Sequence, residues 1–579
     1  MSVFVKPEPV RGVPINCAEA PATFVDVLYD HAGYLRANGG KIARADMRGK
    51  NVAVVGAGAA GLLAGYHLLG LQANVTIFEA GSRAGGRIDT RYPIAGSAAA
   101  YEMGAMRVPP CQQLFNYYAD RFDLQPGGQF PDPGQIDTRI IYRNRAYSWT
   151  AGDKPPAIFN KVSTAWTNFA NSYSELTALL TKPTQESLAK AHQLWQAQVY
   201  SPVGLGPETG LSTISFYQGL VEQFVENYAN WGIAEPWNGD DFELFATLGL
   251  GSGGFGPLYG VNFAEIVRLI VNGLESDQQF YPGGLCKLID GFLRYDPHGT
   301  SLGSCVRYDS RVAGITGTPG TPGARVTLAD GSSSEFDAVI VTASNRSMQV
   351  EMALSDPYPL PAVPLIDAPT ASAIREMHMM NSSKLFVMTK NKFWQDLDRA
   401  LPANIQSDTL FRGLYCLDYH PGTDMDGGYG VVLVSYTWGD DSSKYLAVKD
   451  PHERLRVLLR SMQPCAADFA AAFEAALIPD TVELIDWQDR LGYYGAFKVN
   501  YPGQDQYNQD SYYQFLKGGP VYLAGECVGW CGGWIENALQ TGINAAAAVV
   551  RDLMGQDALY PNDPTTQRAN TYQYGPLLS

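Results

Sequence analysis

The chain has 579 residues, of which 46% are hydrophobic and 17% charged, a balance typical of a packed globular protein with several domains. Acidic residues outnumber basic ones, 58 to 42, and the resulting net charge of −16 disfavours nucleic acid as a partner. No uncharged apolar run is long enough for a membrane span, and the first residues lack the apolar core of a signal peptide.

Eight cysteines are scattered along the chain without the spacing of a disulfide framework. Cys527 and Cys531 have three residues between them and no histidine cluster nearby, which is not a zinc pattern. We therefore expect reduced thiols, a cytoplasmic protein and no metal site. The oligomeric state stays open, with a homodimer as one option.

The first strong structural pattern follows an irregular lead-in, residues 1–50. An apolar strand at 51–55 leads into a glycine-rich turn and a helix at 56–71, and a second strand follows at 74–80. This order predicts a βαβ unit with two parallel strands and a right-handed crossover, which is the core of a Rossmann-like α/β domain.

The turn of this unit carries a dinucleotide-binding motif. Gly56, Gly58 and Gly61 form G-x-G-x-x-G, where the glycines allow a tight turn, the approach of a pyrophosphate and close packing of helix on strand. Glu79 ends the second strand, where an acid would bind ribose hydroxyls and repel the 2′-phosphate of NADP.

The remaining chain alternates between helical and β patterns without an internal repeat. We expect a discontinuous dinucleotide-binding domain, a mainly helical insertion, a substrate-binding domain with a mixed sheet, and a loosely ordered tail. Their ranges are, in that order, 51–110 with 285–345 and 505–555, then 111–284, 346–504 and 556–579.

Two further segments favour FAD over NAD. A second glycine pair with flanking arginines, at 83–87, directly follows the βαβ unit and forms another loop suited to an anion. Near the C-terminus, Glu526 follows a strand and a helix begins near Trp534. The positive end of that helix could face the electron-rich edge of a reduced flavin.

These motifs together resemble the FAD-dependent amine oxidase superfamily. Within it, the chain is similar to the group of amino-acid oxidases and monooxygenases that includes bacterial tryptophan 2-monooxygenase. The resemblance covers about residues 24–555, and further stretches that carry it are YEMGAMRVPP (101–110), FPDPGQIDT (130–138), VTASNRSMQ (341–349), NSSKLF (381–386), VSYTW (434–438) and GGWIENALQTG (532–542).

The resemblance assigns roles to individual residues. It implies that Arg107 and Tyr436 bind the substrate carboxylate and that Lys384 holds a water near the flavin, where a cation would favour O2 reduction. Trp534 would form one wall of the substrate cage, and Phe255 and Trp487 are weaker candidates for an aromatic pocket. The cofactor would be bound by Gly56, Gly58, Ala59, Ala60, Gly61, Glu79, Ala80, Arg83, Gly85, Gly86, Arg87, Gly104, Ala105, Met106, Arg107, Val312, Gly525, Glu526, Gly533, Trp534, Ile535 and Ala538.

The expected chemistry is oxidation of the Cα–N bond of an L-amino acid by FAD and O2. Residues 251–263 contain no acid to pair a lysine side chain, which favours an apolar substrate. We expect L-tryptophan, converted to indole-3-acetamide as a first step of auxin formation, with L-phenylalanine next. The sequence leaves three alternatives open. They are an oxidase that releases a 2-oxo acid, ammonia and H2O2, a pocket altered by Trp530, and a flavin-binding or chaperone-like protein without turnover.

Overall fold

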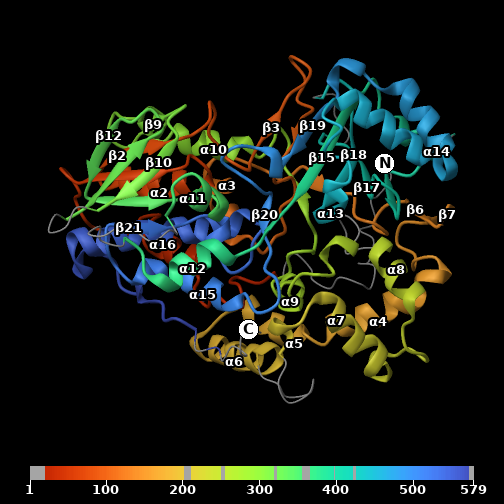
Figure 1. Cartoon of the computed structure of the whole chain (residues 1–579), viewed down its shortest axis with the longest axis horizontal. Helices are drawn as coiled ribbons and strands as arrows, with labels where there is room; N and C mark the ends of the chain where they lie inside the picture. The colour runs from red at the N-terminus through yellow and green to blue at the C-terminus, as the bar shows by residue number, and fades with distance from the viewer. Residues whose placement is uncertain are drawn as a thin grey trace.

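The computed structural model describes residues 20–200, 210–248, 255–317, 322–354, 365–396, 398, 400–420, 426–570 and 572. Residues 1–19 of the lead-in, and the stretch 251–254 that we expected in the substrate pocket, lie outside these residues. Figure 1 shows three regions: a parallel sheet with its helices at the left, a large mixed sheet at the upper right, and a group of helices below.

The first region is built on five parallel strands, which confirms the predicted α/β class and its βαβ unit. Val52 and Val54 of the central strand pack against helices α2 (Ala59–Gly70) and α16 (Ile535–Met554). In sheet order the strands are β21 (Val521–Leu523), β13 (Ala338–Val341), β1 (Asn51–Val55), β2 (Asn74–Phe78) and β9 (Val306–Arg307).

The opposite face of this sheet is covered by a small antiparallel sheet. Ala53 and Val55, which alternate with the helix-facing valines, share a core with Val326 and Ile315. Both faces of the parallel strands are therefore buried, as parallel sheets require. The covering strands are β10 (Val312–Thr316), β11 (Ala324–Leu328) and β12 (Ser333–Phe336).

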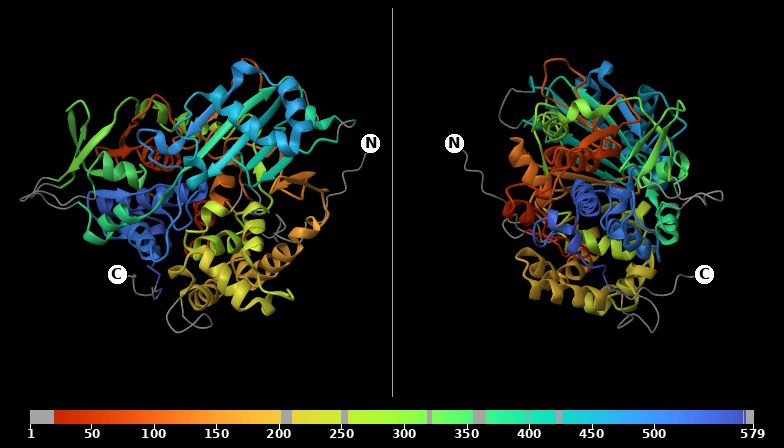
Figure 2. Two further views of the ribbon diagram at one scale, coloured as in Figure 1. Left: turned by 45° about the vertical axis from the view of Figure 1, so that its right-hand side comes forward. Right: turned by 90° about the vertical axis from the view of Figure 1, so that its left-hand side faces the viewer.

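The second region is a seven-stranded mixed sheet in which β16 and β6 are parallel and the other neighbours are antiparallel. Its strands in order are β19 (Glu483–Asp486), β15 (Ser382–Thr389), β18 (Gly430–Trp438), β17 (Gly413–Leu417), β16 (Asn404–Ser407), β6 (Thr138–Tyr142) and β7 (Arg145–Trp149). Helix α14 (Pro451–Ala476) lies across its outer face (Figure 2).

Strand alternation divides this sheet into an outer and an inner face. Leu385 and Val387 pack into the core under α14, whereas Phe386 and Met388 pack on the inner face, toward the parallel sheet. A β-bulge in β18 puts Val434 and Ser435 on the outer side in succession. Residues after the bulge, including Tyr436, therefore return to the inner face.

The third region is mainly helical, with aromatic rings such as Trp166, Phe216 and Phe245 at its centre. Its helices are α4 (Asn160–Asn171), α5 (Ser174–Thr181), α6 (Gln185–Trp195), α7 (Phe216–Val221), α8 (Gly239–Leu248) and α9 (Phe263–Val271).

The range 111–284 also supplies β6 and β7 to the mixed sheet, which a mainly helical insertion did not anticipate. Arg143 and Asn144 join the two strands with φ of +47° and +59°. Two successive residues with positive φ make the tight turn of a hairpin, and this turn lacks the Asn-Gly or Asp-Gly pair that marks most such hairpins. The turn residues therefore gave no signal in the sequence.

The tail is packed over much of its length, contrary to the expectation of loose order. Leu559 and Asp563 are buried, and the Asn570 side chain donates to the backbone oxygen of Asp26 at 2.8 Å. Asp563 also caps a short helical turn at Pro564–Thr566. The Asn, Thr and Pro residues that looked like linker composition are here hydrogen-bonding and turn residues.

Shorter elements connect the three regions. They are α1 (His31–Ala37), β3 (Thr90–Arg91), β4 (Tyr101–Glu102), α3 (Gln113–Arg121), β5 (Gly128–Gln129), β8 (Gln279–Phe280), α10 (Cys286–Leu293), α11 (Asn345–Val350), α12 (Ala368–Glu376), β14 (Met379–Met380), α13 (Gly439–Ser443), β20 (Phe497–Lys498) and α15 (Asp505–Tyr512). None of the helices in the described part of the chain is long and apolar enough to cross a membrane.

Candidate active site

A cavity of about 520 Å³ lies where the three regions meet. Its wall combines the βαβ turn, the inner face of the mixed sheet, helix α9 and the start of α16. Most residues expected to bind the cofactor line it: Gly56, Gly58, Ala59, Ala60, Glu79, Ala80, Gly85, Gly86, Arg87, Gly104, Ala105, Met106, Arg107, Val312, Gly525, Glu526, Gly533, Trp534, Ile535 and Ala538.

The βαβ turn brings backbone N–H groups to one end of the cavity. Gly56 has φ +103°, and a Cβ there would lie 2.7 Å from Thr342 Oγ1. Gly58 precedes α2, and no side chain caps the helix N-terminus. These free N–H groups and the helix dipole form a site for an anion such as a pyrophosphate.

Gly61 has a packing role and does not line the cavity. A Cβ on Gly61 would lie 2.0 Å from the Gly56 carbonyl oxygen, so only glycine allows α2 to approach β1 this closely. This matches the function that the motif assigns to its third glycine.

Glu79 closes the same end of the cavity. Its two carboxylate oxygens accept hydrogen bonds from the backbone N–H groups of Ala57 and Gly81, each at 2.9 Å. Burial raises the pKa of Glu79, and the two N–H groups oppose this effect. The carboxylate is fixed at the cavity wall with acceptor capacity left for ribose hydroxyls.

Arg83 does not line the cavity, contrary to its expected contact with the cofactor. Its guanidinium donates to the backbone oxygens of Ile88 and Gly86 at 3.0 and 2.7 Å, and lies 3.3 Å from Asp89. Arg83 therefore shapes the loop that carries the second glycine pair, because it satisfies carbonyl groups that the loop leaves unpaired.

The early and late glycine-rich motifs meet through one ion pair. Arg87 lies 2.5 Å from Glu526, although 439 residues separate them in sequence. Glu526 also accepts the backbone N–H groups of Lys498 and Gly533 at 2.7 and 2.6 Å. Helix α16 begins after Trp534, and the Gln112 side chain accepts the backbone N–H of Glu536 in its first turn at 2.9 Å. Trp534 and Ile535 line the cavity, so the positive end of the helix lies at its wall.

Arg107 lies at the other end of the cavity, between two aromatic rings. The centroids of Phe130 and Trp534 are 5.7 and 5.9 Å from its guanidinium carbon. The guanidinium also donates to the side-chain oxygen of Gln278 and lies 3.4 Å from Glu275. The rings hold the guanidinium plane, which leaves its edge available for a carboxylate.

Lys384 and Tyr436 are cross-strand neighbours on the inner face of the mixed sheet. Lys384 Nζ lies 4.8 Å from the Tyr436 ring centroid and donates to the carbonyl oxygens of Glu102 and Gly104 at 3.0 and 2.5 Å. Burial lowers the pKa of Lys384 to about 7, while the Glu102 carboxylate acts in the opposite direction. This amine can change protonation near neutral pH.

Two of the predicted aromatic residues have different outcomes. Trp487 lines the cavity, and its ring N–H donates to the Met103 carbonyl oxygen at 3.1 Å. Phe255 is not among the described residues that line the cavity, and its ring stacks on Phe245 in the helical region, 5.5 Å between centroids. Phe255 therefore packs into the core of the helical region and does not reach the cavity.

Trp530 does not narrow the cavity. It is fully buried and packs 5.5 Å from the guanidinium of Arg268 and 5.8 Å from the Tyr572 ring, on the far side of its loop. Cys531 lines the cavity, whereas the Cys527 thiol donates to the Ala343 carbonyl oxygen. The described residues contain no group of His, Cys, Asp and Glu able to bind a metal.

The substrate end contains residues that the sequence analysis missed. Trp438 lies two positions after Tyr436 on β18, so strand alternation alone could have placed it on the same face. Helix α9 contributes Ile266 and Leu269, and Phe497 packs near Trp438. No local sequence signal marks Glu265 and Glu275, which also line the cavity.

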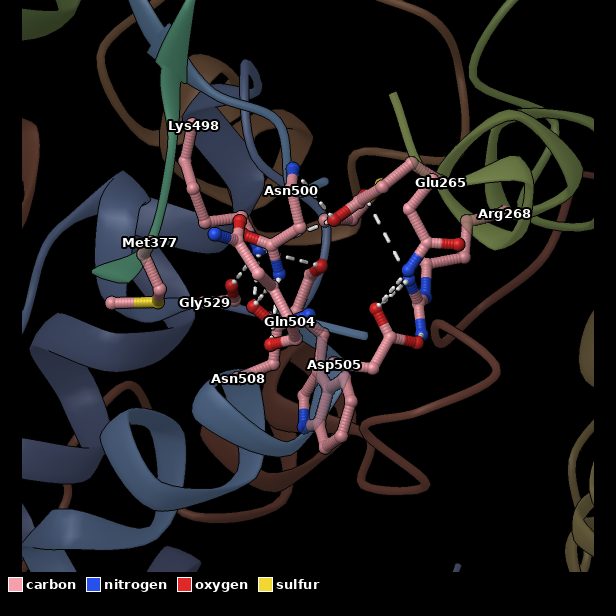
Figure 3. Close-up of polar contacts among 12 residues, drawn as sticks. Glu265, Arg268, Met377, Lys498, Asn500, Gln504, Asp505, Asn508 and Gly529 are labelled. Carbon is pink, nitrogen blue, oxygen red and sulfur yellow. Dashed lines mark hydrogen bonds and ion pairs between the residues drawn. The ribbon is translucent and has the colours of Figure 1, made fainter. Parts of the chain in front are cut away.

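Glu265 belongs to a buried polar network behind the cavity wall (Figure 3). Its carboxylate lies 3.7 Å from Lys498 and 3.8 Å from Arg268. Arg268 in turn pairs with Asp26 and Asp505 at 2.8 and 2.6 Å. The network links the lead-in, α9 and α15, and each of its acids has a cation nearby.

The fold and this cavity define a dinucleotide-binding oxidoreductase with a buried guanidinium at the end of the cavity opposite the βαβ turn. The chain matches the family described as flavin containing amine oxidoreductase over residues 59–550. It therefore belongs to that family.

Relatives that match over nearly their full length have the same enzyme class, and solved structures share the fold. The chain is 36% identical to "Tryptophan 2-monooxygenase" of Pantoea agglomerans pv. gypsophilae, over 95% of this chain and 98% of the relative. It is 36% identical to the protein of the same name from Pseudomonas savastanoi, over 92% and 96%. A putrescine oxidase structure bound to putrescine (18% identity, TM-score 0.63, 86% of this chain and 99% of that chain) and cyclohexylamine oxidase from Brevibacterium oxydans IH-35A (16%, 0.60, 87% and 99%) share the fold.

A flavin is the cofactor of this family, and the residues present fit FAD. The uncapped start of α2 and the turn at Gly56 provide for the pyrophosphate, and Glu79 provides for a ribose. Trp534 at the start of α16 lines the same cavity as Lys384 and Arg107, and these residues would be available to the isoalloxazine ring.

Proposed function

We propose that the chain catalyses the oxidative decarboxylation of L-tryptophan, in which L-tryptophan and O2 give indole-3-acetamide, CO2 and water. The observation that carries this proposal is a guanidinium, Arg107, at the edge of a wall of apolar and aromatic side chains. That wall consists of Leu258, Ile266, Leu269, Trp438, Phe497 and Val499. Relatives named tryptophan 2-monooxygenase, at up to 36% identity over nearly their full length, support the same substrate.

The acids of the cavity do not argue for a cationic substrate. Glu265 and Glu275 line the cavity but lie outside the acid-free segment 251–263 that favoured an apolar substrate. The absence of acids in that segment therefore does not describe the whole cavity. Each is compensated, Glu275 by Arg107 and Glu265 by Lys498 and Arg268. The observation that favours an indole ring is the wall itself, because an indole would gain from burial against its apolar and aromatic side chains.

FAD, held by the residues described above, would supply a two-electron acceptor for the substrate and a donor for O2. Arg107 and Tyr436 bind the substrate carboxylate and thereby orient Cα–H, while Trp534 and Trp438 confine the side chain. Lys384 places a positive charge near the point where O2 is reduced. The apolar wall disfavours water beside the imino acid, and the partition between amide and 2-oxo acid depends on how far water is excluded there.

Product analysis tests the proposal. The purified enzyme is incubated with L-tryptophan, L-phenylalanine or L-lysine in air, and CO2, amide, 2-oxo acid and H2O2 are quantified. Equal amounts of CO2 and indole-3-acetamide would support it. Indole-3-pyruvate with H2O2 would make the enzyme an L-amino acid oxidase, the activity named for a 25% identical relative from Bungarus fasciatus. A flavin that no amino acid bleaches anaerobically would refute both activities.

Location and assembly are part of the same proposal. The seven described cysteines are free, which supports a reducing, cytoplasmic location. We retain the homodimer as a prediction. Cell fractionation and sedimentation of the purified protein test these two points.

A further inference from the structure

The carboxylate anchor already has an acidic partner. Glu275 lines the cavity with its carboxylate 3.4 Å from Arg107, and Gln278 bridges the two side chains. The Gln278 amide nitrogen donates to Glu275 at 3.2 Å and to the Leu274 carbonyl oxygen at 2.9 Å, which fixes its orientation. Glu275 is therefore held beside the position where a substrate carboxylate would bind Arg107.

A second acid lies behind the anchor. Asp132 is buried, interacts electrostatically with Arg107, and has one carboxyl oxygen, Oδ1, without a hydrogen-bond partner. Burial raises the pKa of Asp132 to about 7, and burial also raises the pKa of Glu275. With Asp132 protonated, Arg107 and Glu275 form a neutral pair of largely buried side chains.

This charge balance changes when an amino acid binds. A zwitterion brings a carboxylate that pairs with Arg107, which leaves Glu275 without a counterion in a buried place. It also brings an ammonium group one carbon away from that carboxylate. Removal of a hydride from Cα requires the nitrogen lone pair, so the ammonium must lose a proton before oxidation.

We propose that Glu275 is the base that accepts the proton of the substrate's α-ammonium group when the substrate carboxylate replaces it on Arg107. The inference rests on the proposed function. One N–H bond of the ammonium breaks and one O–H bond forms on Glu275, while the electron pair stays on nitrogen. Before binding, the site holds Arg107 and ionised Glu275; afterwards it holds Arg107 and the substrate carboxylate, so its net charge is zero throughout.

Other titratable groups that face the anchor fit this role less well. Lys384 directs its amine to two carbonyl oxygens, and burial raises the pKa of Tyr436, which therefore stays protonated. Asp132 does not line the cavity. The Cys111 thiol donates to the Gly273 carbonyl oxygen, and burial raises its pKa. Glu275 alone among these groups combines a cavity position with a partner that the substrate displaces.

A binding experiment on the FAD-loaded enzyme tests the charge balance without turnover. Indole-3-propionate, a tryptophan analogue without the amino group, brings a carboxylate but no proton. We expect it to draw about one proton from a weakly buffered solution per molecule bound, measured with an indicator dye, and to bind about tenfold more weakly per pH unit above the pKa of Glu275. The neutral indole-3-propionamide should draw none.

The Glu275→Gln variant keeps the shape of the side chain but cannot accept a proton. It should bind indole-3-propionate without proton uptake. Anaerobic flavin reduction by L-tryptophan should fall about 100-fold at pH 7, and then rise about tenfold per pH unit as the substrate amine deprotonates in solution. Glu275→Asp, which restores a carboxylate, should recover part of the rate and the flat pH profile of the wild type.

Glu265→Gln is the matched control because it removes another buried cavity carboxylate, one that contacts Lys498 and Arg268 (Figure 3). It should keep the wild-type proton uptake. Wild-type uptake or a wild-type pH profile in Glu275→Gln would overturn the proposal. If that variant does not bind FAD, absence of proton uptake by the wild type overturns it instead. Failure of L-tryptophan to reduce the wild type would refute the proposed function, while proton uptake still reports on Glu275.

Discussion

Replacing Arg107 by Met tests the substrate anchor most directly. The side chain is almost fully buried between Phe130 and Trp534, so methionine can fill the space while removing the charge. A hydrogen bond to a charged group contributes about 1.5–3 kcal/mol. Two such bonds would contribute about 3–6 kcal/mol to substrate binding. In the variant, Glu275 has no counterion and becomes protonated before the substrate binds, which removes part of the cost of displacing it. We therefore expect a loss at the lower end, about 3 kcal/mol.

That loss corresponds to roughly 150-fold weaker binding, since each 1.36 kcal/mol is tenfold. The assay is anaerobic titration of flavin reduction, which gives the dissociation constant and the reduction rate separately. Tryptamine, which has the same ring and amine but no carboxylate, is the control substrate. We expect the variant to lose affinity for L-tryptophan and to keep its affinity for tryptamine. Equal weakening of both, with normal FAD content, would show that Arg107 supports the pocket and does not bind the carboxylate.

Three further predictions concern other parts of the molecule. Lys384→Met should slow reoxidation of the reduced enzyme by O2 about 100-fold in stopped flow, with a smaller effect on flavin reduction by the substrate. In the wild type, reoxidation should slow as pH rises through about 7, because burial lowers the pKa of Lys384 to about 7 and only the charged amine stabilises the developing negative charge on oxygen. Gly56→Ala should yield protein with less FAD per chain, measured by absorbance, because the new Cβ would meet Thr342 Oγ1 at a backbone φ of +103°. Burial lowers the pKa of His31 to about 4 and of His67 to about 3, so the unfolded chain binds protons before the folded chain as pH falls below about 6.5. Each histidine then lowers the free energy of unfolding by about 1.4 kcal/mol per pH unit, down to its folded pKa. Urea unfolding of His67→Gln should show a shallower pH dependence than the wild type, and an unchanged slope would contradict this.

Most of the nucleotide site could be predicted from local sequence motifs. The turn at Gly56, the acid at Glu79 and the start of α16 each depend on a few adjacent residues, so their pattern is visible without a structure. The pair of Lys384 and Tyr436 came from family resemblance, because a lysine in an apolar strand has no signature of its own.

The contacts missed in the sequence depend on distant parts of the chain. Glu275 meets Arg107 across 168 residues, and Gln278 meets it across 171. Nothing near either residue marks it as a partner of an arginine. The assignment of Phe255 failed for the related reason that an aromatic residue near a glycine-rich loop can pack into either of two neighbouring cores. Such choices are decided by tertiary packing, which periodicity does not encode.

The extra residue in β18 has a consequence for evolution and engineering. If all nine residues of the strand alternated strictly from Leu433 with no bulge, Tyr436 and Trp438 would turn toward α14, and Ser435 and Thr437 would face the cavity. Deleting Val434 should remove the bulge and let Ser435 follow Leu433 in regular alternation, so that Tyr436 and Trp438 keep the inner face. A single insertion that is taken up as a bulge leaves the side chains beyond it on their original faces, so the strand can gain a residue without losing its aromatic wall.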